Sequence, residues 1–148
     1  MKKQLNTEIE INASPEKVWR FLTDFASYPN WNPFIKSIKG TIAVGEKLEV
    51  FLQPPGAKGM GFKPTVLTVE KEKEFRWLGK LFISGLFDGE HIFQIEMLDE
   101  NRVKFVQSEN FNGLLVGFLA KSLDTDTLRG FKEMNEALKN LAEKTDAD

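Results

Sequence analysis

The middle of the chain is a series of strand-like runs, and most of the connections between them are too short to hold a crossover helix. The six runs are residues 35–40, 46–52, 62–71, 74–81, 86–98 and 103–111, and the last two are joined by Asp99-Glu100-Asn101-Arg102. Parallel neighbours need a connection of a dozen or more residues, whereas antiparallel neighbours can be joined by a tight hairpin. The sequence therefore predicts an antiparallel sheet, which limits the possible folds strongly.

The chain opens with a further strand and a helix. Residues 4–12 alternate between apolar and polar side chains, which is typical of a strand with one wet face. The face that we expect to point inward carries Leu5, Thr7, Ile9 and Ile11. Residues 14–16 (SPE) favour a helix start through a serine cap, a proline at the first position and an acidic first turn. The Pro-rich residues 28–34 predict a second, short helix.

The C-terminal part of the chain is helical in pattern from residue 114 to about Lys144. Asp124-Thr125-Asp126 should bend or break this helix, because such side chains compete for backbone hydrogen bonds. An amphipathic helix can cover one face of a sheet. The predicted fold class is α+β, with one domain over residues 1–148. A curved antiparallel sheet of about seven strands would grip the long C-terminal helix, in the order strand, two helices, six strands, helix.

A polar cluster lies on two neighbouring strands at positions that should be apolar. Because side chains alternate along a strand, His91 shares a face with Phe93, while Gln107 and Glu109 share one with Phe111. His91 is the single histidine of the chain. Polar side chains on apolar faces predict a cavity with polar contents rather than a solid core.

The short turn at residues 99–102 should bring His91 close to Glu109. Pairing across it joins positions whose numbers sum to about 201, which puts His91 opposite about residue 110. A carboxylate on an inward face must be paired, hydrogen-bonded or protonated. The two groups can orient a ligand or act as an acid–base pair. The structural alternatives are a hydrogen-bonded core histidine and a bulge that turns Glu109 to solvent.

Two further features bear on a cavity. Trp77 shares its strand face with Gly79, which removes bulk and can leave room for a ligand. The loop at residues 53–61 is rich in Gly and Pro but lacks the spacing of a phosphate-binding loop. We expect it to be a flexible lid over the cavity mouth, with an inert loop as the alternative.

Composition excludes several classes of function. The chain has no cysteine, which removes thiolate catalysis and cysteine-based zinc sites, and one histidine with scattered carboxylates does not form a zinc set. A net charge of −2 gives no basic surface for nucleic acid. No apolar run approaches the ~18 residues of a membrane span, and the first residues lack an apolar signal core. We expect a cytoplasmic protein without metal, cofactor or nucleic-acid partner, and the oligomeric state is left open.

Several motifs resemble the START-like, or SRPBCC, superfamily of helix-grip proteins. Its first strand-to-helix junction and second short helix resemble residues 11–19 (INASPEKVW) and 28–34 (YPNWNPF). A polyketide cyclase/dehydrase-like subgroup resembles residues 89–93 (GEHIF) and 105–113 (FVQSENFNG), and the gripping helix matches residues 129–135 (RGFKEMN). The similarity covers nearly the whole chain. It implies the helix-grip fold but not one activity, because the superfamily includes lipid carriers, aromatase/cyclases and chaperone activators.

We therefore expect a small apolar or amphipathic ligand, of lipid, polyketide or aromatic type, to bind between the sheet and the C-terminal helix. The expected polar and aromatic contacts are Trp77, His91, Gln107 and Glu109, and the expected walls are Phe93, Phe111, Phe131 and Met134. One alternative is a cyclase or dehydratase in which Glu109 is the base and His91 the partner acid. Another is a protein-interaction module, which requires an exposed apolar patch and a filled cavity.

Overall fold

The computed structural model of the protein describes residues 1–81 and 85–144. The strands are β1 (Lys2–Ile11), β2 (Ile35–Lys39), β3 (Glu49–Leu52), β4 (Met60–Phe62), β5 (Thr65–Glu70), β6 (Glu74–Leu81), β7 (Phe87–Asp99) and β8 (Arg102–Asn112). The helices are α1 (Pro15–Thr23), α2 (Tyr28–Trp31), α3 (Val116–Ser122) and α4 (Leu128–Lys144), with a 3₁₀ turn at Phe25–Ser27 and a π-helical turn at Leu123–Thr127.

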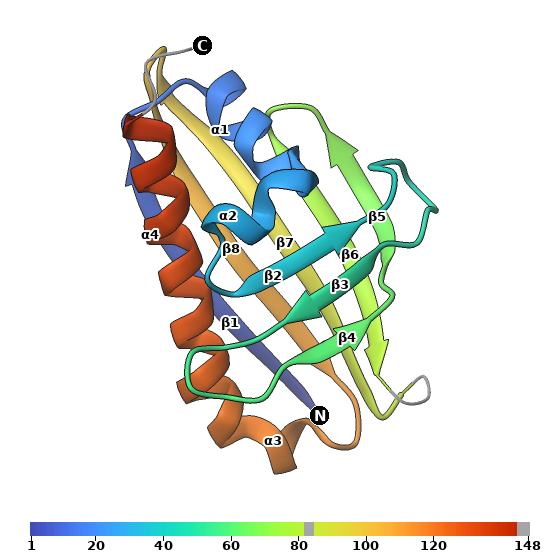
Figure 1. The fold of residues 1–148 in the computed structure, drawn as a ribbon. Helices are drawn as coiled ribbons and strands as arrows, with labels where there is room; N and C mark the ends of the chain where they lie inside the picture. Colours follow the sequence, from blue (N-terminus) through green and yellow to red (C-terminus); the bar gives the residue numbers. More distant parts are fainter. Residues whose placement is uncertain (82–84, 145–148) are drawn as a thin grey trace.

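The strands form two antiparallel sheets. The larger has the order β1-β8-β7-β6-β5, and the smaller has the order β2-β3-β4. Figure 1 shows the smaller sheet lying across the face of the larger one, with α4 running beside it over β1. This arrangement confirms the predicted α+β helix-grip fold. In the described residues, no helix is both long and apolar enough to cross a membrane.

The sheet is divided where a single curved sheet of about seven strands was expected. The expected strand at residues 62–71 is split into β4 and β5 around Pro64, which has no N–H to donate to a ladder. The carbonyl of Pro64 accepts a hydrogen bond from the Leu48 backbone N–H at 2.9 Å. One isolated bridge, between Lys47 and Thr65, then links the two sheets.

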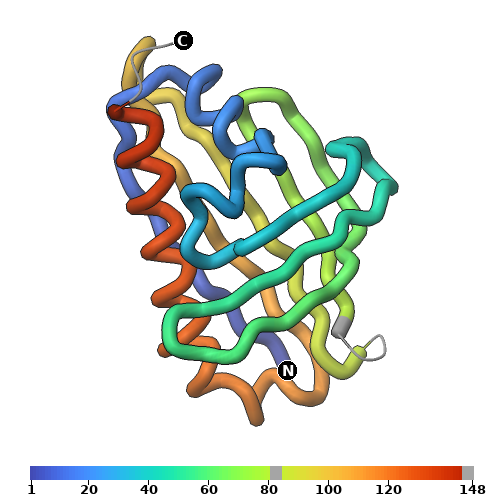
Figure 2. The backbone as a smooth tube through the Cα atoms, viewed as in Figure 1, coloured from blue at the N-terminus to red at the C-terminus, as the bar shows by residue number. Residues whose placement is uncertain are grey.

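The expected interruption of the C-terminal helix is present as the π-helical turn between α3 and α4. Thr125 Oγ1 donates a hydrogen bond to the Lys121 carbonyl at 2.9 Å, so a side chain shares a backbone acceptor at this point. The backbone trace in Figure 2 shows α3 lying close to the start of β1, while α4 ends at the opposite end of the molecule. The two helices therefore contact different parts of the large sheet.

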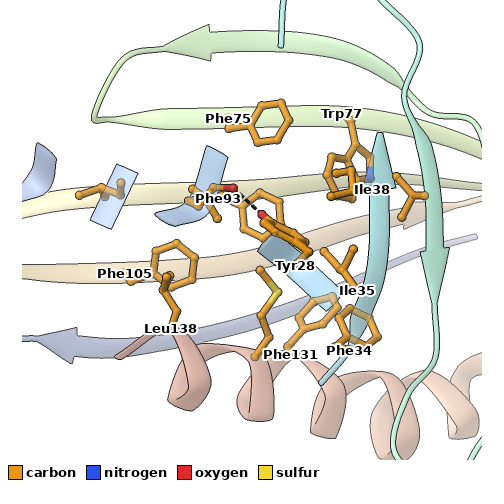
Figure 3. Close-up of a cluster of buried hydrophobic side chains, with 14 of the residues drawn as sticks. Tyr28, Phe34, Ile35, Ile38, Phe75, Trp77, Phe93, Phe105, Phe131 and Leu138 are labelled. Atoms are coloured by element: carbon orange, nitrogen blue, oxygen red, sulfur yellow. Dashed lines mark hydrogen bonds between the residues drawn. The ribbon is translucent and has the colours of Figure 1, made fainter. Parts of the chain in front are cut away.

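The core is a cluster of aromatic side chains between the large sheet and the elements that cover it. Figure 3 shows the sheet contribution, Phe75, Trp77, Phe93 and Phe105, facing Tyr28, Phe34 and Phe131. The Phe34 and Phe131 rings meet edge to face with centroids 5.5 Å apart. The Phe34 ring also covers Gly130, where a Cβ atom would overlap the ring. Gly130 is thus required by the close approach of α4 to this buried ring.

We expect Gly130→Ala to destabilise the protein by roughly 1–3 kcal/mol, because the new methyl group meets a buried ring that cannot move aside. Chemical denaturation would measure this loss in the free energy of unfolding.

Gly117→Ala is the matched control, since it also adds a methyl group to a helical glycine. Its neighbour is the Met1 side chain, which is 74% exposed and can move away. We expect Gly117→Ala to be neutral or to stabilise by up to about 1 kcal/mol through helix propensity. Equal effects of the two substitutions would contradict the packing argument.

Candidate functional site

The site is built from rows of inward side chains that run across β8, β7 and β6. In order, the rows are Phe111, Gly89 and Gly79; Glu109, His91 and Trp77; and Gln107, Phe93 and Phe75. The register places Glu109 directly opposite His91, one position from the expected pairing. No bulge lies between these rows, so the predicted proximity of the two side chains is confirmed.

His91 is enclosed by protein and bonded at both ring nitrogens. Its Nδ1 lies 3.2 Å from Glu109 Oε1, and its Nε2 lies 2.9 Å from Gln107 Oε1. The His91 side chain is 1% exposed, against 13% for Glu109. Three rings surround the imidazole with centroids 4.6–5.0 Å away, those of Trp77, Phe93 and Phe131. Within this pair, only the Glu109 side chain is partly exposed.

The hydrogen bonds continue from Gln107 into the covering helix and the first strand. Gln107 Nε2 donates to Asn135 Oδ1 at 2.8 Å and more weakly to the Phe131 carbonyl at 3.4 Å. Asn135 Nδ2 donates to Thr7 Oγ1 at 2.9 Å, and the Thr7 hydroxyl donates to the Gln107 carbonyl at 2.7 Å. We call Thr7, His91, Gln107, Glu109 and Asn135 the polar chain. It joins β1, β7, β8 and α4 inside an apolar core.

Two backbone carbonyls set the direction of the polar chain. A carbonyl can only accept, so the Thr7 hydroxyl must donate to Gln107, and Asn135 must then turn its NH₂ to Thr7 and its oxygen to Gln107. The Phe131 carbonyl likewise requires the NH₂ end of the Gln107 amide. Amide orientations are assigned from such partners. Reversing these two amides would leave buried donors and acceptors without partners, at a cost of about 1–3 kcal/mol for each.

A cavity of about 220 Å³ lies beside the polar chain, between the two sheets and the α3 end of the molecule. It is lined by Phe34, Leu52, Pro54, Ala57, Lys58, Met60, Phe62, Gly79, Phe87, Gly89, Glu109, Phe111, Leu119, Ser122, Leu123, Asp126 and Thr127. Most of this wall is apolar, and the exposed Lys58, Met60 and Ser122 belong to its rim. The Gly- and Pro-rich loop expected at a cavity mouth thus contributes to the wall. Its expected mobility stays a prediction.

Two paired glycines make the floor of the cavity. Gly79 on β6 lies opposite Gly89 on β7. A Cβ atom at Gly89 would overlap Glu109 Oε2, and one at Gly79 would come within 3.0 Å of the Phe62 ring. The missing side chains therefore leave space for a carboxylate and a ring at the cavity surface. Room for a ligand at Gly79 stays a prediction.

The predicted site residues divide into two groups. Glu109 and Phe111 line the cavity. The other predicted residues are buried in the adjoining core and do not line it: Trp77, His91, Phe93, Gln107, Phe131 and Met134. The cavity also adjoins α3 and the π-helical turn instead of α4, because the apolar side chains of α4 fill the space against the sheet. A ligand-binding role for the buried group stays a prediction.

Sequence reasoning missed Asn135, Gly89 and the role of Thr7. Thr7 had a visible signal, since it is the one polar residue on the inward face of the first strand. Asn135 lies four residues after Phe131 and three before Leu138, which places it on the apolar stripe of the helix. Gly89 had no comparable signal, because a glycine near a strand end is ordinary.

A separate surface hollow near α1 shares no residue with the cavity. Its lining includes the charged side chains Lys17, Lys71 and Glu72. Its volume of about 740 Å³ is larger, but its lining is mostly polar and charged, and the polar chain lies elsewhere. The candidate site is therefore the apolar cavity that reaches Glu109.

The fold and the cavity place the chain among START-like helix-grip proteins, and comparisons with known proteins agree. A family model described as polyketide cyclase / dehydrase and lipid transport matches residues 2–145. The chain belongs to this family. A search of curated proteins gives no match.

Solved structures with the same fold come from bacteria and plants. The Zhui aromatase/cyclase from Streptomyces sp. R1128 has a TM-score of 0.79 at 14% identity, over 97% of this chain and 95% of that chain. A START superfamily protein from Mycobacterium smegmatis has a TM-score of 0.71 at 22% identity, over 95% and 97%. Norcoclaurine synthase from Thalictrum flavum, in complex with dopamine and hydroxybenzaldehyde, has a TM-score of 0.75 at 14% identity, over 100% and 90%. At these identities the likeness concerns the fold.

We expect Asn135→Leu to destabilise the protein by roughly 2–4 kcal/mol, because it leaves buried groups of Gln107 and Thr7 without their partner. Chemical denaturation would measure the loss. Asn140→Leu, at an exposed position of the same helix, is the control and should change stability by less than about 0.5 kcal/mol. Similar losses in both variants would show that the polar chain does not stabilise the fold.

Proposed function

We propose that the protein binds a small hydrophobic ligand in the 220 Å³ cavity, with the Glu109 carboxylate as its polar contact. The observation that carries this proposal is a mostly apolar cavity with the partly buried Glu109 carboxylate on its floor. Ligand pockets are typically apolar with a few placed polar groups. An apolar molecule gains by leaving water for such a wall, and the carboxylate selects its orientation.

The comparisons support a ligand of this size and type. The family description names both cyclase/dehydrase activity and lipid transport. The norcoclaurine synthase structure holds dopamine and hydroxybenzaldehyde, which are small aromatic molecules. We infer that a lipid-, polyketide- or aromatic-like molecule of similar size is the ligand of this protein.

The protein-interaction alternative has less support. It expects a filled cavity together with an exposed apolar patch. Leu114 and Phe118 are 78% and 88% exposed, which supplies apolar surface, but the cavity beside them is open. The cavity therefore favours a ligand-binding protein.

We expect Leu119→Trp to weaken binding of an apolar probe such as naphthalene at least tenfold, because Leu119 lines the cavity and a larger ring would occupy it. Native mass spectrometry of the wild type would also detect a copurified small molecule, and the variant should lose it.

Phe118→Trp is the matched control on the same helix, since Phe118 faces outward. We expect it to bind the probe like the wild type. A wild type that binds no apolar probe and copurifies with no small molecule would overturn the proposed function. An equal loss of probe binding in both variants would indicate that the probe binds at the outer face of α3.

An enzymatic function is the second candidate, and the 3.2 Å contact between His91 Nδ1 and Glu109 Oε1 favours it. Glu109 would act as the base toward a substrate in the cavity, and His91 would be its partner acid through this contact. Positioned acid–base groups typically contribute 10²–10⁴-fold to the rate.

We therefore expect His91→Ala and Glu109→Gln each to reduce any cyclase or dehydratase turnover by about 10²–10⁴-fold. Steady-state rates with a polyketide-like or aromatic substrate would measure the loss, and Asn140→Leu serves as a variant remote from the site. Unchanged rates in both site variants would leave ligand binding as the sole proposal.

A further inference from the structure

We propose, on the basis of the binding function above, that the ligand donates a hydrogen bond to Glu109 Oε2, so that it is a hydroxyl- or N–H-bearing hydrophobe and not a carboxylate. The proposal comes from counting hydrogens along the polar chain. Each step uses a contact whose donor and acceptor can be assigned.

The first step concerns His91 Nε2. The Gln107 amide turns its NH₂ end to Asn135 and the Phe131 carbonyl, which leaves Oε1 facing the imidazole at 2.9 Å. An amide oxygen only accepts. His91 Nε2 must therefore carry a hydrogen, and this holds for every state in which the polar chain is complete.

The second step concerns the contact between His91 Nδ1 and Glu109 Oε1. If His91 is neutral, its hydrogen is already on Nε2, and Nδ1 presents a lone pair. A lone pair facing a carboxylate oxygen at 3.2 Å is repulsive unless a proton lies between them. The pair therefore holds one proton in that contact. It is an imidazolium with a carboxylate, or a neutral imidazole with a carboxylic acid.

The third step concerns the other carboxylate oxygen. The shared proton lies on the Oε1 side in both forms, so Oε2 is an acceptor in both. Oε2 lies over Gly89 and receives no hydrogen bond within residues 1–81 and 85–144. It borders the cavity, where Glu109 is part of the wall. A ligand that fills the cavity would remove this acceptor from water, and an acceptor buried without a donor costs about 1–3 kcal/mol. We therefore assign a donor to the ligand.

The same geometry disfavours a ligand carboxylate or a lone carbonyl at this position. Either would place a second acceptor against Oε2. The ligand class is thus a phenol, an alcohol or an N–H-bearing ring. Its polar group would lie toward Gly89 on the floor, and its apolar body would lie against the apolar wall of the cavity.

Nitrogen NMR can test the proton count without any ligand, because His91 is the single histidine of the chain. At neutral pH we expect protonated Nε2, together with either protonated Nδ1 or a protonated Glu109 carboxyl in the ¹³C spectrum. In Glu109→Gln we expect neutral His91 with the hydrogen on Nε2. A bare Nε2, or a bare Nδ1 beside an ionised Glu109, would overturn the proposal.

Binding of matched naphthalene probes tests the ligand class. We expect the wild type to bind 1-naphthol about tenfold more tightly than 1-methoxynaphthalene, which cannot donate, and to bind 1-naphthoate more weakly than either. Glu109→Gln should keep the preference for naphthol, because its NH₂ must face Nδ1 and its oxygen the cavity. Glu109→Leu should bring the naphthol-to-methoxynaphthalene ratio to about one.

The outcomes separate this proposal from the proposed function. Binding of naphthalene without preference for naphthol, or with preference for naphthoate, would overturn the ligand class and leave the binding function standing. Failure to bind all probes would overturn the binding function, while the NMR result would still decide the proton count. If Glu109→Leu does not fold, Glu109→Gln and the wild-type probe series carry the test.

Discussion

The fold depends on one continuous set of buried hydrogen bonds that ties the closing helix to the sheet. Asn135 of α4 sits between Thr7 of β1 and Gln107 of β8, and its two amide atoms contact one each. Moving α4 along its axis by one turn would leave both strands with unpaired buried groups, which is costly in a core. Apolar packing alone tolerates such slips better. The polar chain therefore specifies how α4 is positioned, and with it the π-helical turn and α3, which precede α4 directly and line the cavity.

The floor of the cavity is formed by two positions without side chains, where the Glu109 carboxylate and the Phe62 ring come close to the backbone. Gly79 and Gly89 face each other across β6 and β7, next to a row filled by Trp77, His91 and Glu109. The large sheet is thus solid along most of its inner face and hollow at one end. The carboxylate of Glu109 lies at the boundary between these regions. This places the carboxylate where a ligand can reach it and keeps its partner His91 out of reach.

Much of the fold could be predicted from the sequence, because local rules determine it. The alternation of apolar and polar residues and the short turns predicted an antiparallel sheet. The turn at residues 99–102 predicted the pairing of His91 to within one residue. Asp124-Thr125-Asp126 predicted the interruption of the C-terminal helix. The site was harder, because it depends on contacts between distant segments. Nothing local shows that Asn135 reaches both Thr7, 128 positions away, and Gln107, 28 positions away. The division of the sheet at Pro64 was visible in principle, since proline cannot donate to a ladder.

The π-helical turn at Leu123–Thr127 changes which side chains of α3 lie on the same face as Phe131 and Asn135 of α4. Such a turn holds one residue more than an α-helical turn, and one residue corresponds to a rotation of about 100°. If the helix ran on from α4 without it, the stripe of Phe131 and Asn135 would continue through Asp124 and Gly117. With it, the stripe continues through Leu123 and Leu119, both of which line the cavity. The apolar character of that wall therefore depends on a single residue of chain length. Deletion of Asp124 or Thr125, neither of which lines the cavity, would change the chemistry of the cavity.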